Sequence, residues 1–359
     1  MKIKLFDASI GKDEEQAVKK VLKSGFWASG SGTGNVKKFE NSFQKYINAK
    51  NCIAVNSGTS ALNLAFSLID LKNKEVIVPS LTFVSSVHSI VLNGGKPIFV
   101  DVDPETLCID PDSIQSSISK KTTAILPVHF AGMPCNLSKI SNICKTNNLH
   151  LIEDAAHSAG TTYKNKKIGS HGFAVCFSFH PVKNLAMPTG GLIALNDKDH
   201  LNLRKSLESR RWCGITDRIG TSYDIKEMGW NYYMNEFSAS IGLSQLKKLD
   251  RMNNYRKKIA YRYHKELNIE NKIPFDKNCV YHIFWIQVKD RLKFMKKMSS
   301  KGIETGIHYK PVHKMTLYNQ KTKLPITDQI EKQIVSIPIH PNLSNSDVDY
   351  IISTINKSI

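Results

Sequence analysis

The sequence predicts an α/β fold, in which a mostly parallel sheet is covered by helices and a smaller α+β unit follows. Two observations predict it. Over the first two thirds of the chain, segments with helical periodicity alternate with short apolar runs typical of buried strands. Near residue 235 this pattern gives way to one long, charged helical segment. With 359 residues, 41% of them hydrophobic, the chain can bury one large core or two.

The alternation in the first part of the chain can be followed segment by segment. Residues 13–25, DEEQAVKKVLKSG, predict an amphipathic helix that ends at Gly25. Further helices are expected over 59–70 and 137–148. Strands are expected where the runs are apolar, at 75–79, 96–103, 121–130, 149–156, 173–179 and 191–195. Strands separated by helices in this way favour parallel pairing.

The second part of the chain begins with the long helical segment 235–267. We expect a domain boundary inside it, near residue 245, which gives a large domain over 1–245 and a small one over 246–359. In the small domain the predicted strands cover 280–288 and 303–309, and the predicted helices cover 290–302, 327–337 and 345–355.

Composition restricts the function. The net charge of +19 comes from basic residues spread along the chain in short runs, which favours anionic ligands over nucleic acid. No run of 18 apolar residues occurs, and the N-terminus lacks the apolar core of a signal peptide, so we expect no membrane partner and a cytoplasmic location. The seven cysteines have no CxxC or metal-ligand spacing, so we expect reduced thiols and no metal site.

Polar residues follow several predicted strands, where open α/β sheets bind their ligands. In AVNSGTSALNLA, Ser57 to Ser60 open a helix whose free N–H groups and hydroxyls can hold a phosphate, although an ordinary helix cap would look the same. In LIEDAAHSAG, Asp154 ends a strand and His157 follows it. A buried carboxylate there needs a partner such as a protonated ring nitrogen, or it caps the next segment while His157 packs in the core.

The stretch FSFHPVKNLAMPTGG places Lys183 between two predicted core strands, with Ser178 just before it. Burial would lower the pKa of this lysine and make it a nucleophile, whereas a loop lysine would reach water. Phe83 follows the strand at 75–79 and can stack on a flat ring or pack in the core. Asn231 precedes the long helix and can bind a phosphate or form a turn. A phosphate cradle, a carboxylate, a stacking ring and a buried lysine together indicate a pyridoxal phosphate site.

The sequence resembles the DegT/DnrJ/EryC1/StrS sugar aminotransferases, which are fold-type-I enzymes that use pyridoxal phosphate. The resemblance covers nearly the whole chain. It is carried by FENSFQKYINAKNCIAVNSGTSAL, EVIVPSLTFVSS, KPIFVDVDPETLCID, AILPVHFAGMPCNL, LIEDAAHSAG, FSFHPVKN, GWNYYMNEFSASIGLSQLKKLD, KGIETGIHYKPVH and SIPIHPNLS. It implies a large domain with a mostly parallel seven-stranded sheet and a smaller α+β C-terminal domain.

The resemblance also implies a role for each matching residue. Lys183 would form the Schiff base with the cofactor and transfer the proton. Asp154 would pair with the pyridine nitrogen, His157 would lie near the phenolic oxygen and Phe83 would stack on the ring. The phosphate would be held by Gly58, Thr59, Ser60 and Ser178, and by Asn231 of the neighbouring subunit. Activity would therefore require a homodimer with shared active sites.

For the reaction, the resemblance implies transfer of an amino group from L-glutamate to a nucleotide-linked keto-sugar, for a cell-surface polysaccharide or glycoconjugate. Related dehydratases carry histidine at the position of Lys183, so the lysine indicates a transaminase. The FHPVK form favours amination at C4 of a 4-keto-6-deoxy sugar. Substrate contacts are expected from Trp27, His308, Tyr309 and Lys310.

Two departures from the family pattern lie near the expected site: PTGG (Pro188 to Gly191) replaces GEGG, and Tyr233 replaces an arginine. Both can change the choice of substrate. Alternatives therefore stay open: amination at C3, a non-sugar substrate, or a protein without turnover that is a cofactor-bound regulator or a basic nucleic-acid binder.

Overall fold

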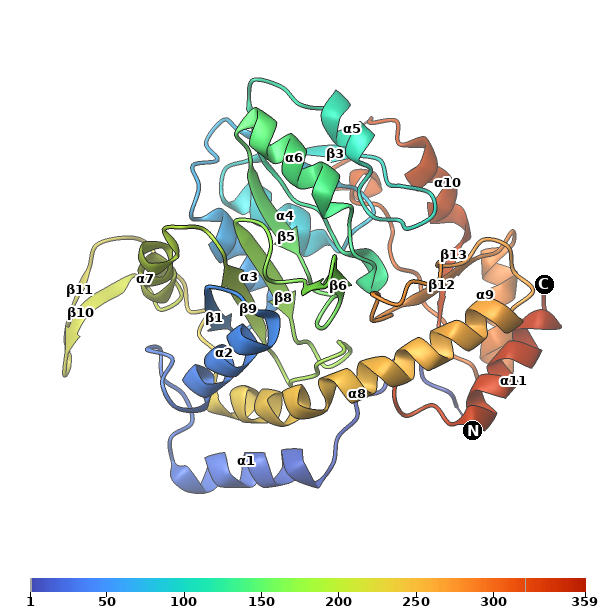
Figure 1. Ribbon diagram of the computed structural model, residues 1–359, viewed down its shortest axis with the longest axis horizontal. Coiled ribbons are helices and arrows are strands. Elements are labelled where there is room, and N and C mark those ends of the chain that lie inside the picture. Colours follow the sequence, from blue (N-terminus) through green and yellow to red (C-terminus); the bar gives the residue numbers. More distant parts are fainter. Residues whose placement is uncertain (1, 320) are drawn as a thin grey trace.

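The computed structural model describes residues 2–319 and 321–359, and its centre is a seven-stranded sheet (Figure 1). The strand order is β1-β9-β8-β5-β4-β2-β3. β9 pairs antiparallel with both β1 and β8, and the remaining pairs are parallel. The strands are β1 (Asn51–Val55), β2 (Glu75–Pro79), β3 (Lys96–Val100), β4 (Thr122–Ile125), β5 (His150–Asp154), β8 (Ala174–Ser178) and β9 (Gly191–Leu195). The predicted α/β class with a mostly parallel sheet is confirmed.

Helices bury both faces of this sheet, because side chains along each strand alternate between two apolar clusters. On β1, Ile53 and Val55 belong to the cluster that contains residues of α3 (Gly58–Phe66), α4 (Val84–Leu92) and α7 (His200–Arg210). Cys52 and Ala54 belong to the cluster on the other face. That face is covered by α2 (Gly34–Ile47), α5 (Pro111–Ser116) and α6 (Leu137–Asn147).

The 31-residue helix α8 (Glu236–Glu266) joins the sheet to the C-terminal unit without a break at residue 245 (Figure 1). It packs on α1 (Lys12–Ser24) and α2, and its far end lies near α11 (Asn345–Asn356). The C-terminal unit also contains β12 (Phe284–Gln287), β13 (Ile334–Ile337), α9 (Arg291–Ser300) and α10 (Pro325–Gln333). Residue 3 bridges to residue 303, so the start of the chain lies against this unit. The domain division near 245 stays a prediction.

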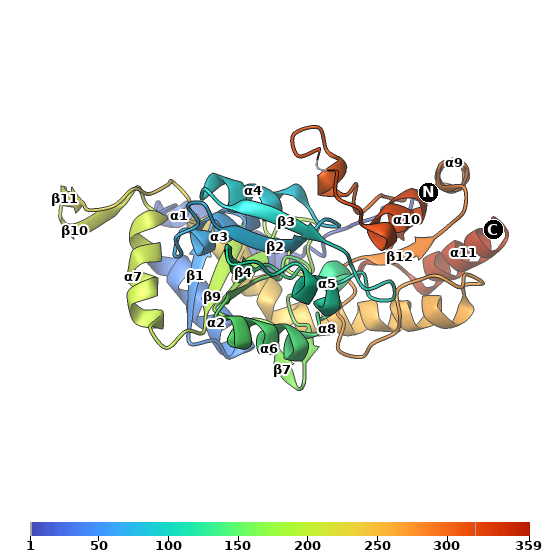
Figure 2. The same cartoon turned by 90° about the horizontal axis from the view of Figure 1, so that it is seen from above.

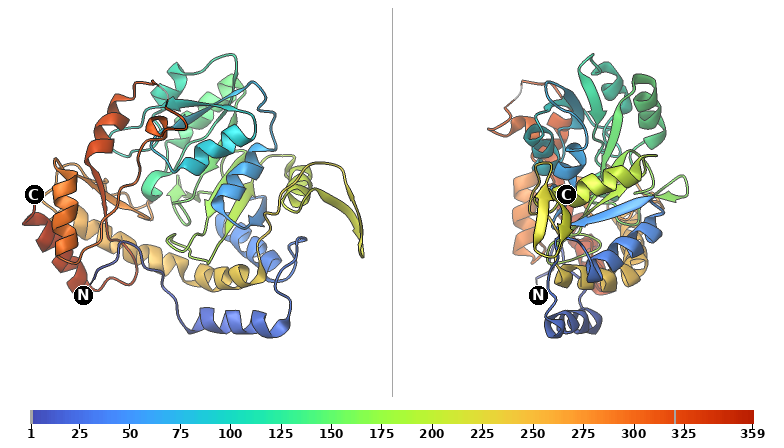
Figure 3. Two further views of the ribbon diagram at one scale, coloured as in Figure 1. Left: turned by 180° about the vertical axis from the view of Figure 1, so that it is seen from behind. Right: turned by 90° about the vertical axis from the view of Figure 1, so that its left-hand side faces the viewer.

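Smaller elements complete the chain. A hairpin of β10 (Ile215–Ile219) and β11 (Ser222–Ile225) projects from the body of the molecule (Figure 2). Figure 3 shows the same hairpin from behind, at the opposite end of the molecule from the C-terminus. The remaining elements are β6 (Thr162–Tyr163), β7 (Lys166–Lys167) and the single 3₁₀ turns at Phe130–Gly132 and Val312–Lys314.

Two predictions for the C-terminal unit are wrong. Residues 327–337 do not form one helix, because α10 ends at Gln333 and residues 334–337 form the buried strand β13. Its β-branched side chains pair antiparallel with β12, and this burial outweighs the helical pattern that precedes it. Residues 303–309 do not form a strand either; their pairing consists of isolated bridges at Ile303 and Gly306.

A buried ion network centred on Glu40 of α2 fixes that helix to β1 of the sheet. Glu40 is fully buried and accepts hydrogen bonds from Arg211 (2.8 Å), Arg204 (2.9 Å) and the backbone N–H of Ala54 (2.9 Å). We expect Glu40→Ala to lower the free energy of unfolding by about 3–5 kcal/mol, because it leaves Arg211 buried without a partner charge. Chemical denaturation measures this loss.

The matched control for that change is Glu208→Ala, which removes the more exposed carboxylate that binds the same Arg204 side chain. We expect this control to cost less than about 1 kcal/mol. Equal losses for the two variants would contradict the assigned role of the Glu40 network.

Candidate active site

A cavity of about 320 Å³ opens at the carboxyl edge of the sheet. Its walls come from the start of α3, the loop after β2, the ends of β5 and β8, the turn after β8 and a segment of the C-terminal unit. The lining residues are Ser57, Gly58, Thr59, Leu62, Thr82, Phe83, Ser85, Val128, Asp154, Ala156, His157, Ser178, His180, Val182, Lys183, Thr189, Gly190, His308 and Tyr309. The fold therefore brings together most of the residues that the sequence selected.

One end of the cavity is the N-terminus of α3. Gly58, Thr59 and Ser178 line it. A Cβ on Gly58 would lie 2.6 Å from the Cβ of Ser178, so only glycine lets the helix start this close to the end of β8. Free N–H groups and the positive end of the helix dipole at this point favour an anion.

Ser60, which we expected to bind the phosphate, does not line the cavity. Its hydroxyl donates to the Asn56 side chain at 2.6 Å, and its backbone N–H donates to the Ser57 hydroxyl at 3.1 Å. Ser57 is therefore the N-cap of α3, and the hydrogen bonds of Ser60 stabilise the turn that leads into this helix.

Asp154 lies at the end of β5 and is 4% exposed. One carboxylate oxygen accepts a hydrogen bond from the Ser86 hydroxyl at 2.7 Å, and the other accepts from the backbone N–H of Ala156 at 3.0 Å. The Thr82 hydroxyl lies 2.9 Å from that of Ser86 and donates to it, because the Ser86 proton is already used. Ser86 and Thr82 were missed from the sequence, although both lie in the LTFVSS stretch that carries Phe83.

Lys183 lies in the turn after β8, where its backbone N–H donates to the carbonyl of His180 at 2.8 Å. Burial lowers the pKa of its amine to about 8, and the charge of Asp154 opposes this shift. About a tenth of the amine is therefore neutral and nucleophilic at pH 7, far more than for a lysine of ordinary pKa. Its Nζ lies 3.5 Å from Nε2 of His282, a residue that the sequence did not single out.

His157 and Tyr309 both line the cavity and contact each other. Nδ1 of His157 accepts a hydrogen bond from the backbone N–H of Ala131 at 3.2 Å, so Nε2 carries the proton and donates to the Tyr309 hydroxyl at 3.1 Å. Burial, reinforced by the charges of Lys183 and His308, holds the pKa of His157 well below its usual value. Burial also raises the pKa of Tyr309, with the charge of Asp154 adding to the shift. Tyr309 therefore keeps its proton and can donate it to a ligand.

Phe83 and His308 complete the rim. Phe83 is 55% exposed, and its ring centroid lies 5.9 Å from that of Tyr309. An exposed aromatic ring beside a cavity is free to stack on a flat ligand. Nδ1 of His308 lies 2.8 Å from the Ser336 hydroxyl on β13, and burial, with the Lys183 charge, lowers the pKa of His308 to about 4.

Besides Ser60, three predicted residues do not line the cavity of their own chain. Trp27 is half-exposed and packs against Phe237, and Lys310 is exposed. The side chain of Asn231 is exposed, and its backbone carbonyl accepts a hydrogen bond from Asn56 at 3.3 Å. The expectation for Asn231 concerned a neighbouring subunit, which a single chain does not test.

Both departures from the family pattern contact the segment between β1 and α3. Thr189 of PTGG lines the cavity, and its hydroxyl donates to the carbonyl of Asn56. A Cβ on Gly191 would lie 2.2 Å from the carbonyl oxygen of Ser57, so this glycine is required for the loop to pack. Tyr233 bridges to Val55, at the end of the strand that leads into the same loop.

These residues fit pyridoxal phosphate. The start of α3, which a side chain on Gly58 would block, suits the phosphate, and Asp154 suits a protonated ring nitrogen. Lys183 offers an amine of lowered pKa to the aldehyde, and Phe83 offers a ring for stacking.

The comparisons with known proteins agree with this geometry. Residues 8–356 match the model of the DegT/DnrJ/EryC1/StrS aminotransferase family. The chain is 34% identical to an uncharacterized protein of Methanocaldococcus jannaschii over 99% of this chain and 97% of that one. It is similar to Helicobacter pylori PseC, an aminotransferase involved in the biosynthesis of pseudoaminic acid, with 25% identity, coverage of 100% and 99% and a TM-score of 0.93.

A second similar structure is the putative sugar aminotransferase Spr1654 of Streptococcus pneumoniae, solved in forms with pyridoxal phosphate and with pyridoxamine phosphate. The form with pyridoxal phosphate shares 26% identity with this chain and has a TM-score of 0.93, with coverage of 100% of this chain and 98% of that one. Within the described residues, no helix has the length and apolar character needed to cross a membrane. The family match, the fold and the cavity agree, and the chain belongs to the DegT/DnrJ/EryC1/StrS aminotransferases, which use pyridoxal phosphate.

Proposed function

We propose that this enzyme transfers an amino group from L-glutamate to a nucleotide-linked keto-sugar, and that the amino sugar serves a cell-surface polysaccharide or glycoconjugate. The observation that supports this proposal most is that the whole chain is similar to structures described as sugar aminotransferases, and that Lys183 and Asp154 line one cavity. The net charge of +19 supports an anionic substrate such as a nucleotide sugar.

When bound, pyridoxal phosphate supplies an aldehyde for covalent attachment and a ring that accepts electrons from the substrate carbon. We assign separate roles to several of the residues that line the cavity. Gly58, Thr59 and Ser178 bind the phosphate at the start of α3. Asp154 keeps the proton on the ring nitrogen through its carboxylate, which Ser86 and Ala156 hold in place.

We assign the proton transfer to Nζ of Lys183. Its pKa of about 8 lets the amine take a proton from the substrate carbon and return it within one cycle near neutral pH. His157 stays neutral because burial holds its pKa low, so it does not compete for that proton. Tyr309 offers its hydroxyl proton as a hydrogen bond to the bound ligand.

Replacing Tyr309 by phenylalanine tests this donor. The change keeps the ring and removes the hydroxyl, so we expect kcat/KM to fall about tenfold, the effect of one lost hydrogen bond. Steady-state kinetics measure it, with Tyr318→Phe as the control, because that tyrosine lies among Phe99 and His88 outside the cavity. An unchanged kcat/KM in Tyr309→Phe would show that the hydroxyl binds no ligand.

We also propose that two chains share their active sites. The side chain of Asn231 is exposed and outside its own cavity, as expected for a residue that serves a neighbour. The projecting β10–β11 hairpin and the segment after it expose apolar side chains that a second chain would cover: Ile219, Tyr223, Ile225 and Met228.

Mixing two inactive variants tests this sharing. Lys183→Ala and Asn231→Ala should each lose most activity alone. After dissociation and reassociation, half of the dimers are mixed and hold one intact site each, so about a quarter of the wild-type activity should return. If both variants are inactive alone and the mixture is inactive too, Asn231 acts within its own chain; if Asn231→Ala alone keeps its activity, Asn231 serves no active site.

Incubation with a panel of keto-sugar nucleotides and L-glutamate tests the substrate. We expect conversion of a nucleotide-linked 4-keto-6-deoxy sugar and no amination of free keto acids other than the partner of the donor. Conversion of 3-keto sugars alone would move the reaction to C3. Transamination between free amino acids and keto acids, with every sugar nucleotide inert, would overturn the proposal.

A further inference from the structure

His282 is the side chain that the amine of Lys183 meets inside the protein. Nζ of Lys183 and Nε2 of His282 are 3.5 Å apart, although the two residues are 99 positions apart in the sequence. Lys183 follows β8 of the sheet, whereas His282 precedes β12 of the C-terminal unit. The contact therefore links the C-terminal unit directly to the reactive amine.

The ring of His282 is held on several sides and is 2% exposed. Its backbone N–H donates to the carbonyl of Ala131 at 2.9 Å. The ring stacks on Phe6 with centroids 5.4 Å apart and lies 4.5 Å from the ring of His157. The position of Nε2 is thus fixed by packing, as a hydrogen-bond partner for a mobile lysine requires.

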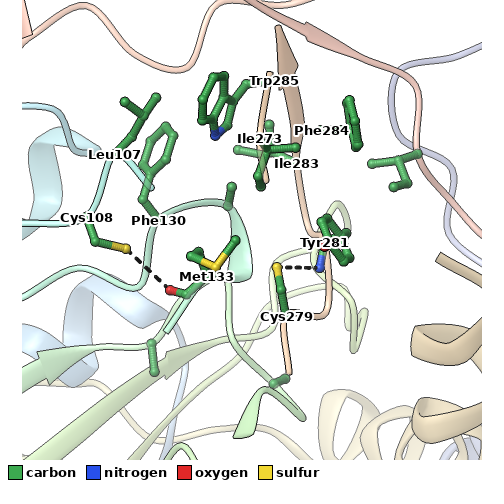
Figure 4. Close-up of a cluster of buried hydrophobic side chains, with 14 of the residues drawn as sticks. Leu107, Cys108, Phe130, Met133, Ile273, Cys279, Tyr281, Ile283, Phe284 and Trp285 are labelled. Atoms are coloured by element: carbon green, nitrogen blue, oxygen red, sulfur yellow. Dashed lines mark hydrogen bonds between the residues drawn. The ribbon is translucent and has the colours of Figure 1, made fainter. Parts of the chain in front are cut away.

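The neighbours of His282 in sequence belong to a rigid core. Figure 4 shows Tyr281 and Ile283 among buried apolar side chains that include Phe130 and Trp285. This cluster joins the loop after β4 to the C-terminal unit. Such packing leaves the histidine little freedom to turn away from Lys183.

His282 is neutral at physiological pH. Burial holds its pKa well below the usual value, and the charges of Lys183, His157, Arg256 and His308 act in the same direction. The charge of Asp154 acts on Lys183, whose pKa it raises against the effect of burial. A neutral imidazole has one nitrogen that accepts a hydrogen bond, and it does not repel an ammonium group.

We propose that His282 is a positioning residue for Lys183: whenever the amine is not attached to the cofactor, Nε2 of His282 accepts its hydrogen bond and holds it in place for proton transfer. This inference rests on the proposed role of Lys183. An acceptor stabilises the ammonium form more than the neutral amine, so the contact raises the pKa of Lys183 relative to the same site without it.

Two amide variants separate this role from simple packing. Glutamine at position 282 can place its amide oxygen near the position of Nε2, whereas asparagine is one methylene shorter and cannot reach Lys183. Both have the same polarity. The cofactor-free full chain is labelled with acetic anhydride across neutral to alkaline pH, and mass spectrometry of the Lys183 peptide gives the pH midpoint of its reactivity.

We expect a midpoint of about 8 in the wild type. His282→Asn should lower it by about one unit, the effect of one lost hydrogen bond to a charged group, and His282→Gln should stay near the wild-type value. In the loaded enzyme, kcat should fall about tenfold in His282→Asn with the KM for glutamate unchanged, and should recover in His282→Gln.

Equal midpoints in all three proteins, or the same shift in both variants, would overturn the proposal. If a variant does not fold, ¹⁵N NMR of the wild type decides: Nε2 of His282 should resonate as an acceptor and change in Lys183→Met, and an unchanged resonance would refute the contact. The labelling uses no amino donor and no sugar. A negative labelling result would therefore not contradict the proposed substrate. A panel of sugar nucleotides without conversion would not contradict the role proposed for His282.

Discussion

Replacing Lys183 by alanine will abolish transamination, with a fall in kcat of about 10⁴-fold, because Lys183 supplies the one amine among the described residues that line the cavity. The other lining residues with titratable nitrogens, His157, His180 and His308, have pKa values lowered mainly by burial, so they are poor bases. Steady-state kinetics with glutamate and the accepted keto-sugar measure this loss.

The matched control is Lys120→Ala, which removes an exposed lysine that does not line the cavity. We expect it to retain most of the activity. If Lys183→Ala kept more than about one hundredth of the wild-type rate, the proton would have to move through another group, and the mechanism proposed for the cavity would be wrong.

Replacing Asp154 by asparagine will have the second-largest effect. The amide keeps the shape of the side chain but removes the charge that holds the proton on the ring nitrogen, so we expect kcat to fall by about 10²–10³-fold. The amide also cannot accept from both Ser86 and Ala156 at the two positions that the carboxylate oxygens occupy, which leaves one buried donor unpaired.

Ser86→Ala is the control for that change. It removes one hydrogen bond to the carboxylate and keeps the charge, so we expect a loss of about tenfold. The visible absorbance of the loaded enzyme should shift in Asp154→Asn and stay near the wild type in Ser86→Ala. An effect of Ser86→Ala as large as that of Asp154→Asn would mean that the geometry of the carboxylate matters more than its charge.

Local sequence predicted the residues at the carboxyl edge of the sheet. Gly58, Asp154 and Lys183 each follow an apolar strand within a few positions, and parallel strands deliver such residues to a common edge. Taken together, these residue types also indicated a pyridoxal phosphate site, and the resemblance to the family implied the role of each residue. The individual roles stay predictions.

His282 could not be found in the same way. It lies in VYHIFWIQV, where a single histidine in an apolar run is typical of the core, and Lys183 is 99 residues away. Only the packing of the C-terminal unit against the sheet brings the two together. Ser86 was missed for a related reason, since a serine inside α4 gives no signal of the carboxylate it serves.

Trp27 and Lys310, from which substrate contacts were expected, do not line the cavity of the single chain, and their role stays a prediction. The strand at residues 334–337 was missed because the amphipathic pattern of α10 runs directly into it without a glycine or proline between them. Tertiary pairing with β12, which local sequence does not encode, ends the helix there.

The central claim is that Lys183 carries the cofactor beside Asp154. Reduction of the loaded enzyme with borohydride fixes the covalent link, and peptide mass spectrometry then locates it. We predict a single modified peptide containing Lys183, and none after prior removal of the cofactor. Modification of any other lysine, with the Lys183 peptide unchanged, would contradict the account.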